Sequence, residues 1–214
     1  MKVRMLAVVT TVLGLGACSS LYFGTMETLG VHKRDIMVDR VEAARDTQQE
    51  AKNQFLTAME LFKSVVMFQG GNLEDKYNKL NAALRKSEAE AEAVRDRIEA
   101  VEDVSKAMFR EWRSEIKKYD SDALRRSSQE KYEIASTKYT VLIDAMKRAE
   151  SKLEPVLVPL RDRVLFLKHN LNAKAIAGLS DELIVVETNV DILIAEMENA
   201  IAEADAFIAS LQEE

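Results

Sequence analysis

The chain is poor in the residues that build turns, disulfides and aromatic cores. Its 214 residues include 7 glycines, 2 prolines and 1 cysteine, and aromatic residues make up 6%. Folds rich in β-sheet need many tight turns, which glycine and proline supply, so this composition excludes a sheet-rich fold. One cysteine also excludes a framework of internal disulfides.

The residues that are abundant favour long helices. Charged residues make up 31% of the chain and hydrophobic residues 47%, with alanine, glutamate, lysine, leucine and arginine prominent. This balance is typical of long or coiled-coil helices and not of a disordered chain. The formal net charge is -6. An acidic protein has no electrostatic attraction to a phosphate backbone, so we expect no binding to nucleic acid.

The first residues have the parts of an export signal. Lys2 and Arg4 supply positive charge, and the 13 residues from Met5 to Ala17 are largely apolar. A helix that spans a bilayer needs about 20 apolar residues. The stretch therefore has the length of a signal peptide that is removed from the mature protein.

The end of this stretch, Leu15-Gly16-Ala17-Cys18, resembles the lipobox of bacterial lipoproteins. The resemblance implies cleavage before Cys18 and acylation of that cysteine, which anchors the protein to a membrane. Ser19 follows, where aspartate would retain a Gram-negative lipoprotein at the inner membrane, so we expect the periplasmic face of the outer membrane. The expected organisation is a signal peptide at 1–17, a lipidated tether at 18–24 and a helical domain at 25–214.

Apolar residues recur at alternating intervals of three and four along the rest of the chain. This spacing is the seam of helices that pack side by side. The pattern runs without a slip through Leu73, Tyr77, Leu80, Leu84, Ser87, Ala91, Val94, Ile98, Val101, Ser105, Met108 and Trp112. We therefore expect an all-α fold, an elongated antiparallel bundle of about four long coiled-coil-like helices.

Three breaks separate the predicted helices: Gly70-Gly71, residues 119–122, and Gly178. Short connections make neighbouring helices antiparallel, so Cys18, the 119–122 turn and the C-terminus should share one end. Pro155 predicts a kink in the third helix, because proline lacks an amide donor. Beyond the kink, the apolar pattern predicts that this helix continues to about Ala177.

No pattern of catalytic or metal-binding residues is present. The chain lacks GxxxxGK[ST], GxGxxG, GxSxG and HExxH motifs, and its carboxylates lie at helix-surface spacing, where they pair with lysine and arginine. His32 and His169 fall at opposite ends of the predicted bundle, whereas zinc needs three or four close ligands. We expect no enzymatic activity, no cofactor and no metal site.

A polar run interrupts the apolar pattern of the third helix and is the main candidate for partner binding. It consists of Lys168, His169, Asn170 and Asn172. One interpretation is a buried polar layer that sets the register of the helices, which requires hydrogen-bond partners for each group. The other is a partner-docking or ligand-binding patch near the tip that lies away from the membrane.

Basic residues gather at the predicted membrane end. They are Lys33, Arg34, Arg125 and Arg126. They could bind anionic lipid headgroups, to which arginine offers two parallel donors. Alternatively, they pair with nearby aspartates, of which Asp35, Asp120 and Asp122 are the closest in sequence.

Several of these runs together resemble one protein family, domain of unknown function 2959. The resemblance rests on Val31-His32-Lys33-Arg34-Asp35-Ile36, Gly70-Gly71, Trp112, Leu124-Arg125-Arg126-Ser127 and the run from Leu165 to Ala173. The family consists of helical exported proteins and lipoproteins of Gram-negative bacteria with no assigned activity. The resemblance implies an all-helical periplasmic protein and no catalytic residue.

These observations predict a non-enzymatic, lipid-anchored envelope protein that acts as a helical scaffold or partner-docking module. Exposed coiled-coil faces recruit other helices through the packing that forms the bundle, so an envelope protein is the expected partner. The alternative is a ligand- or lipid-binding module with a pocket between helices separated by the prolines. A homo-oligomer in which two chains share a longer bundle is also compatible with the pattern.

Overall fold

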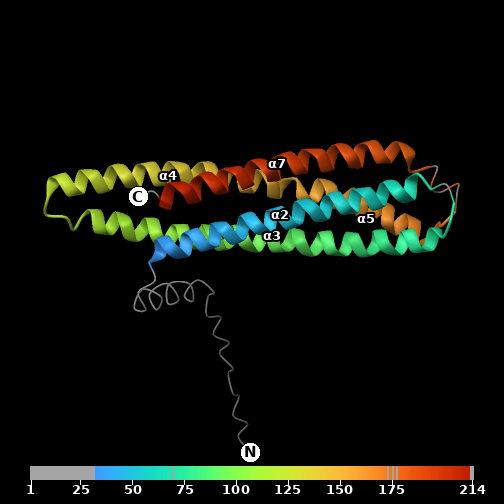
Figure 1. Cartoon of the computed structure of the whole chain (residues 1–214), viewed down its shortest axis with the longest axis horizontal. Helices are drawn as coiled ribbons and strands as arrows, with labels where there is room; N and C mark the ends of the chain where they lie inside the picture. The colour runs from blue at the N-terminus through green and yellow to red at the C-terminus, as the bar shows by residue number, and fades with distance from the viewer. Residues whose placement is uncertain (1–31, 69, 173, 175, 177, 213–214) are drawn as a thin grey trace, which may run out of the picture.

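A computed structural model describes residues 32–68, 70–172, 174, 176 and 178–212. Within these residues there are long helices and no strand. The helices are α2 (Lys33–Val66), α3 (Leu73–Ile116), α4 (Asp122–Ser151), α5 (Leu153–His169) and α7 (Ser180–Gln212). Because α5 continues the direction of α4, the helices form four antiparallel arms of one elongated bundle (Figure 1). The predicted all-α bundle is confirmed.

The arms differ in length, which shapes the two ends of the rod. Helix α2 has 34 residues and α3 has 44, or about 51 and 66 Å at 1.5 Å per residue. The hairpin between α3 and α4 therefore extends past the start of α2 and the end of α7 (Figure 1). We call this the proximal end. The Gly70-Gly71 turn and the connection from α5 to α7 form the opposite end, the distal tip.

Local sequence explains where the helices begin and end. Gly70 and Gly71 have φ angles of 134° and 106°, in a region that favours glycine. The side chain of Asn72 then caps α3 by accepting hydrogen bonds from the amides of Glu74 and Asp75 at 3.1 and 3.3 Å. Ser121 caps α4 in the same way. The predicted signal peptide, Cys18, the predicted tether and the predicted helical residues 25–31 lie outside the described residues.

The heptad seams meet in a continuous core. On α3, every predicted seam position from Leu80 to Met108 is buried, while Leu73, Tyr77 and Trp112 are partly buried and pack against the core. The inward residues of α2 and α7 include Phe55, Phe62 and Leu193, which are 0% exposed. A coiled-coil-like packing of long helices is what the 3-4 spacing predicts.

A ladder of ion pairs borders the contact between α2 and α7. Its pairs are Arg45–Asp205 at 2.9 Å, Lys52–Glu198 at 3.3 Å and Lys63–Glu187 at 2.6 Å. All three basic residues lie on α2 and all three acidic residues on α7. The hydrogen bond to Glu187 raises the pKa of Lys63 above its ordinary value. This division of charge favours one pairing of the two helices over their alternatives.

The kink predicted near Pro155 is confirmed at Lys152, which separates α4 from α5. Pro155 lies in the first turn of α5, where a missing amide donor is tolerated. Pro159 lies inside α5, so the carbonyl of Pro155 has no donor within the helix. The side chain of Asn189 on α7 donates to that carbonyl at 3.0 Å. The neighbouring arm thus satisfies the acceptor that the proline leaves unpaired.

Gln48 is the least satisfied polar residue of the core. Gln48 is 1% exposed, and neither the oxygen nor the nitrogen of its side-chain amide has a hydrogen-bond partner. Burying an unpaired amide is unfavourable. We therefore expect Gln48→Leu to raise the free energy of unfolding by about 1–2 kcal/mol, measured by chemical denaturation.

Gln54 provides the matched control on the same helix. It is also buried, but its side chain donates to the carbonyl of Ala83 at 3.0 Å and to the hydroxyl of Ser87 at 3.4 Å. Gln54→Leu removes satisfied hydrogen bonds, so the free energy of unfolding should fall by about 1 kcal/mol. A gain of equal size in both variants would show that hydrogen bonding does not distinguish the two positions.

Candidate functional site

The polar run Lys168, His169, Asn170 and Asn172 lies at the distal tip, where its first two residues end α5 and its two asparagines follow the helix. Helix α5 ends at His169, so the prediction that it continues to Ala177 is wrong. The side-chain amide of Asn170 donates a hydrogen bond to the carbonyl of Phe166 at 2.9 Å. Its backbone amide donates to the carbonyl of Leu167 at 3.1 Å. The asparagine side chain thus takes the acceptor that would continue the helix.

This ending also excludes the first interpretation of the run. Lys168, His169 and Asn172 are exposed and Asn170 is half-buried. The run is therefore not a buried polar layer that sets helix register. The buried polar residues are in α2 and α3 instead: Thr47, Gln48, Gln54, Ser87 and Ser105.

Beside the run, the surface is hollowed into a cleft of about 540 Å³. Phe166, Asn170 and Asn172 line it together with Arg163 and Glu182. The guanidinium of Arg163 contacts the carboxylate of Glu182 and donates to the carbonyl of Pro159 at 3.3 Å, but its buried Nε has no partner. The cleft therefore combines an aromatic wall, amide groups and a partly unsatisfied arginine, as small-molecule sites commonly do.

Large apolar side chains are exposed around the same tip. Leu165 is 58% exposed, Phe166 45% and Leu171 36%. They flank Lys168 and His169, so apolar and basic groups alternate on the surface. An exposed aromatic residue among polar and basic groups is typical of a protein-binding surface.

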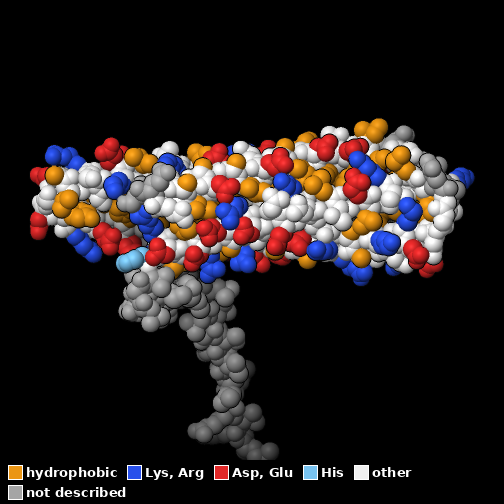
Figure 2. All heavy atoms as spheres, viewed as in Figure 1, with side chains coloured by type: hydrophobic (Ala, Val, Ile, Leu, Met, Phe, Trp, Pro, Cys, Tyr) orange, Lys and Arg blue, Asp and Glu red, His pale blue; other side chains and the backbone are white. Residues whose placement is uncertain are grey.

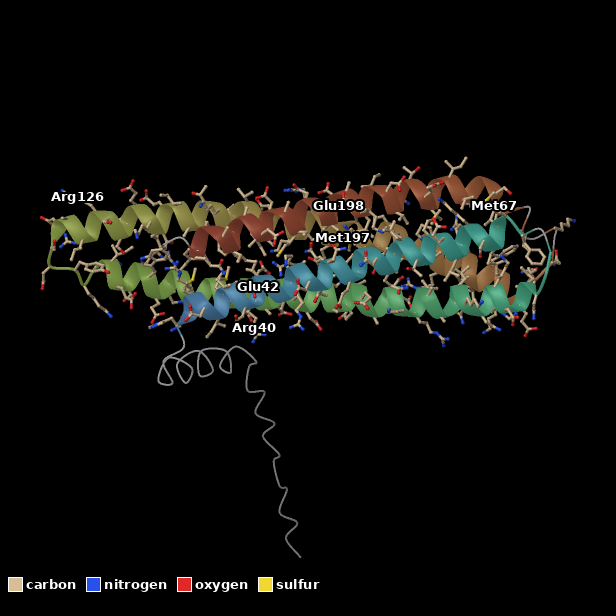
Figure 3. All side chains as sticks on the ribbon, viewed as in Figure 1. Arg40, Glu42, Met67, Arg126, Met197 and Glu198 are labelled. Carbon is tan, nitrogen blue, oxygen red and sulfur yellow. The ribbon has the colours of Figure 1, made fainter. Side chains whose placement is uncertain are left out.

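The predicted basic residues lie at the proximal end. In Figure 3, Arg126 is at the hairpin between α3 and α4, and Met67 is at the opposite end of the rod. Arg125 pairs with Asp122 at 3.1 Å and also donates to the carbonyl of Tyr119 at 2.8 Å. Pairing with a neighbouring aspartate is thus confirmed for Arg125, and binding to lipid stays a prediction.

Lys33 and Arg34, at the start of α2, line a groove at the base of this hairpin. Lys33 pairs with Glu111 of α3 at 2.9 Å, because the start of α2 packs beside α3. The sequence had suggested only aspartates as partners. The groove has a volume of about 450 Å³ and is also lined by Trp112. The indole of Trp112 donates to the hydroxyl of Ser128 at 2.9 Å. The two candidate groups, basic and polar, therefore lie at opposite ends of the molecule.

The titratable groups of the rod form ion pairs along its surface and not a reactive cluster. Hydrogen bonds to Asp205 and Glu102 raise the pKa values of Arg45 and Lys147, and these residues stay charged. Burial raises the pKa of the Tyr139 hydroxyl. In the part of the chain that the structure describes, no three His, Cys, Asp or Glu residues come together as metal ligands, and no helix could cross a membrane.

Two features of the distal tip were not predicted from the sequence: the pair Arg163 and Glu182, and the exposed Phe166. Arg163 and Glu182 are an ordinary arginine and glutamate in their own helices, and only the packing of α7 beside α5 brings them together near the polar run. No local pattern could have identified this pair. The exposed Phe166 was visible only as one more apolar residue beside Leu165 and Leu167.

The fold and these surfaces define an elongated helical-bundle protein with separate features at its two ends. The family model of a protein of unknown function, DUF2959, matches residues 22–211, and the chain belongs to this family. No curated protein matches the chain. The resemblance seen in the sequence is thus confirmed at the level of the family.

Proposed function

We propose that this protein is a lipid-anchored, non-enzymatic rod of the bacterial cell envelope. Acylated Cys18 attaches it to the periplasmic face of the outer membrane, and the distal tip binds an envelope protein. The observation that supports this proposal is the separation of features. The start of α2, which follows Cys18 by 15 residues, lies toward the proximal end, and the exposed Phe166 and Leu171 lie at the other.

The separation gives each end a different task. A short tether after Cys18 holds the proximal end near the bilayer, where Lys33, Arg34, Arg125 and Arg126 meet anionic headgroups. The rod then carries the distal tip about 66 Å away from the membrane end, as the rise of α3 implies. A rigid spacer of this kind presents its tip at a fixed distance without chemistry of its own.

Photocrosslinking in cells tests the tip. We expect a photoreactive amino acid at Phe166 or Leu171 to capture one specific envelope protein, because apolar groups at the centre of an interface contribute most of its affinity. The matched control is Ala89, exposed on α3 away from both ends. Phe166→Glu should abolish capture from Leu171, which reciprocal crosslinking from the captured protein would verify.

The second candidate function is binding of a small ligand in the distal cleft. Arg163 in the wall of the cleft favours it, because a guanidinium binds the carboxylate or phosphate of a ligand with two parallel donors. The two functions predict different results at the same tip. Capture of the same proteins from Phe166 and Ala89 would contradict docking, and a small anion that copurifies with the chain but not with Arg163→Leu would support the second function.

A further inference from the structure

Helix α7 has a second heptad seam on its outward face. Its inner seam runs from Val186 to Leu211 and is buried in the core. A second set of residues, shifted by two positions, lies on the opposite side of the helix. It keeps the same alternation of three and four and is exposed throughout. We call it the outer seam: Val185, Thr188, Ile192, Ala195, Asn199, Ala202, Ala206 and Ala209.

The outer seam is free of charge and partly apolar. Ile184, Val185 and Ile192 are 68%, 51% and 45% exposed, and hydrophobic side chains lie on the surface over this part of α7 (Figure 2). By contrast, no large hydrophobic side chain of α3 is exposed. An amphipathic helix on the surface normally faces water with its polar side. An uncharged heptad seam in that place is the arrangement of a helix that packs against another on both faces.

The positions that flank the outer seam determine which partner fits. In a coiled coil these are the positions that form ion pairs across the interface and select the partner. Here they are Glu182, Ile184, Asn189, Asp191, Glu196, Glu198, Glu203 and Asp205. Six of these eight residues are acidic and none is basic, and α7 as a whole contains no lysine or arginine.

A second copy of this chain is a poor occupant of this surface. A parallel pair of α7 helices would place Asp191 near Glu196 of the other copy, and an antiparallel pair would oppose Glu198 to itself. Both arrangements bring acidic residues together, which is unfavourable. A membrane surface is also a poor occupant, since helices that lie on anionic lipid carry lysine and arginine on their polar face.

The flanking acids already bind basic residues of their own chain, and this does not block a partner. Glu196 pairs with Arg148 at 3.5 Å, and Glu198 pairs with Lys52. These basic residues approach from the bundle side, while Glu196 and Glu198 keep side-chain exposures of 28% and 62%. A carboxylate has about four acceptor positions on two oxygens, so it can accept a second cation from outside.

We propose that the outer seam of α7 binds a helix of a different protein, one with its own apolar heptad seam flanked by lysine or arginine. Asn199 occupies one seam position, where a polar residue fixes the register of the pair. The small residues Ala195, Ala202 and Ala206 allow the two helices to approach closely. This surface runs along α7 away from the distal tip, with which it shares Glu182, and it does not depend on the lipid anchor.

Two synthetic helical peptides test the proposal on the full mature chain. They have identical apolar heptad seams and carry either lysine or glutamate at every flanking position. We expect the lysine peptide to bind about tenfold tighter or more, by fluorescence anisotropy, and its affinity to fall as salt rises. Equal affinity for both peptides, or no binding of either, would overturn the proposal.

Substitutions separate a seam from a general attraction to an acidic protein. Ile192→Glu adds negative charge, so binding by charge alone would strengthen, whereas binding in the seam should weaken about tenfold. Ala89→Glu adds the same charge on exposed α3 and should leave the affinity unchanged. Sedimentation of the chain alone completes the test. If the chain self-associates and Ile192→Glu abolishes that association, the occupant of the outer seam is a second copy and the proposal is wrong.

Discussion

Replacing Phe55 with alanine lowers the free energy of unfolding by about 3–5 kcal/mol. Phe55 is 0% exposed and lies on α2, which packs against both α3 and α7. The substitution removes the transfer free energy of a phenyl ring and leaves a cavity that long, straight helices cannot easily fill. Chemical denaturation followed by far-ultraviolet circular dichroism measures the loss.

The next residue along the chain is the control. Leu56 is 42% exposed, so Leu56→Ala should change the free energy of unfolding by less than about 1 kcal/mol. Since total stabilities are often about 5–15 kcal/mol, Phe55→Ala could unfold the chain. In that case Phe55→Leu, which removes fewer buried atoms, allows the free energy of unfolding to be compared with that of Leu56→Ala. Equal losses at positions 55 and 56 would mean that the seam of α2 is out of register.

The success of the seam prediction has a simple cause. In a rod of long helices, the burial of each residue depends on its angular position around its helix. A residue seven places further along returns to nearly the same angle, so the pattern of burial can be inferred from the spacing of apolar residues. The seam of α3 needed no information from elsewhere in the chain. Turn positions were equally local, because Gly70 and Gly71 adopt φ values that favour glycine and Asn72 caps the helix that follows.

The end of α5 was mispredicted because two local signals conflicted. Leu167 and Leu171 continue an apolar face, which favours a longer helix. Asn170 lies between them and satisfies the carbonyl of Phe166 with its side chain, which ends the helix at His169. The periodicity carried no information on which signal is stronger, and Leu171 is exposed as a result. Of the two interpretations of the polar run, the buried layer is therefore excluded, and the run is exposed at the tip.

The outer seam of α7 was present in the sequence but is hidden by the inner one. The two patterns are offset by two residues, as Val186 with Thr188 and Val190 with Ile192 show, so the sequence of α7 is that of one broadly apolar helix. Burial separates them, because Val186 is 1% exposed and Val185 is 51% exposed. A helix with two seams in a bundle that needs only one is the feature of this fold most directly suited to a partner.

The candidate sites fit a common arrangement along the rod. The proposed attachment lies on the side of the start of α2, the proposed helix-binding seam lies along α7, and the proposed tip site lies at the end of α5. The two proposed docking surfaces differ in chemistry: Phe166 and Lys168 make the tip apolar and basic, whereas the outer seam is bordered by acids. The two proposals therefore require partners of different chemistry.

The proposed lipid attachment has the largest expected effect on where the protein is found. Cys18→Ala should move nearly all of the protein from the membrane pellet to the soluble fraction, because the acyl chains that we propose on Cys18 would no longer hold it to the membrane. Cys18 is the only cysteine of the chain, so no disulfide is lost by the substitution.

Ser19→Asp is the matched variant. It keeps the acylated cysteine and should stay in the membrane pellet, but shift from the outer to the inner membrane on a density gradient. Sedimentation of Cys18→Ala with the membranes, as for the unaltered protein, would contradict lipid anchoring, and the rod would then need another means of attachment.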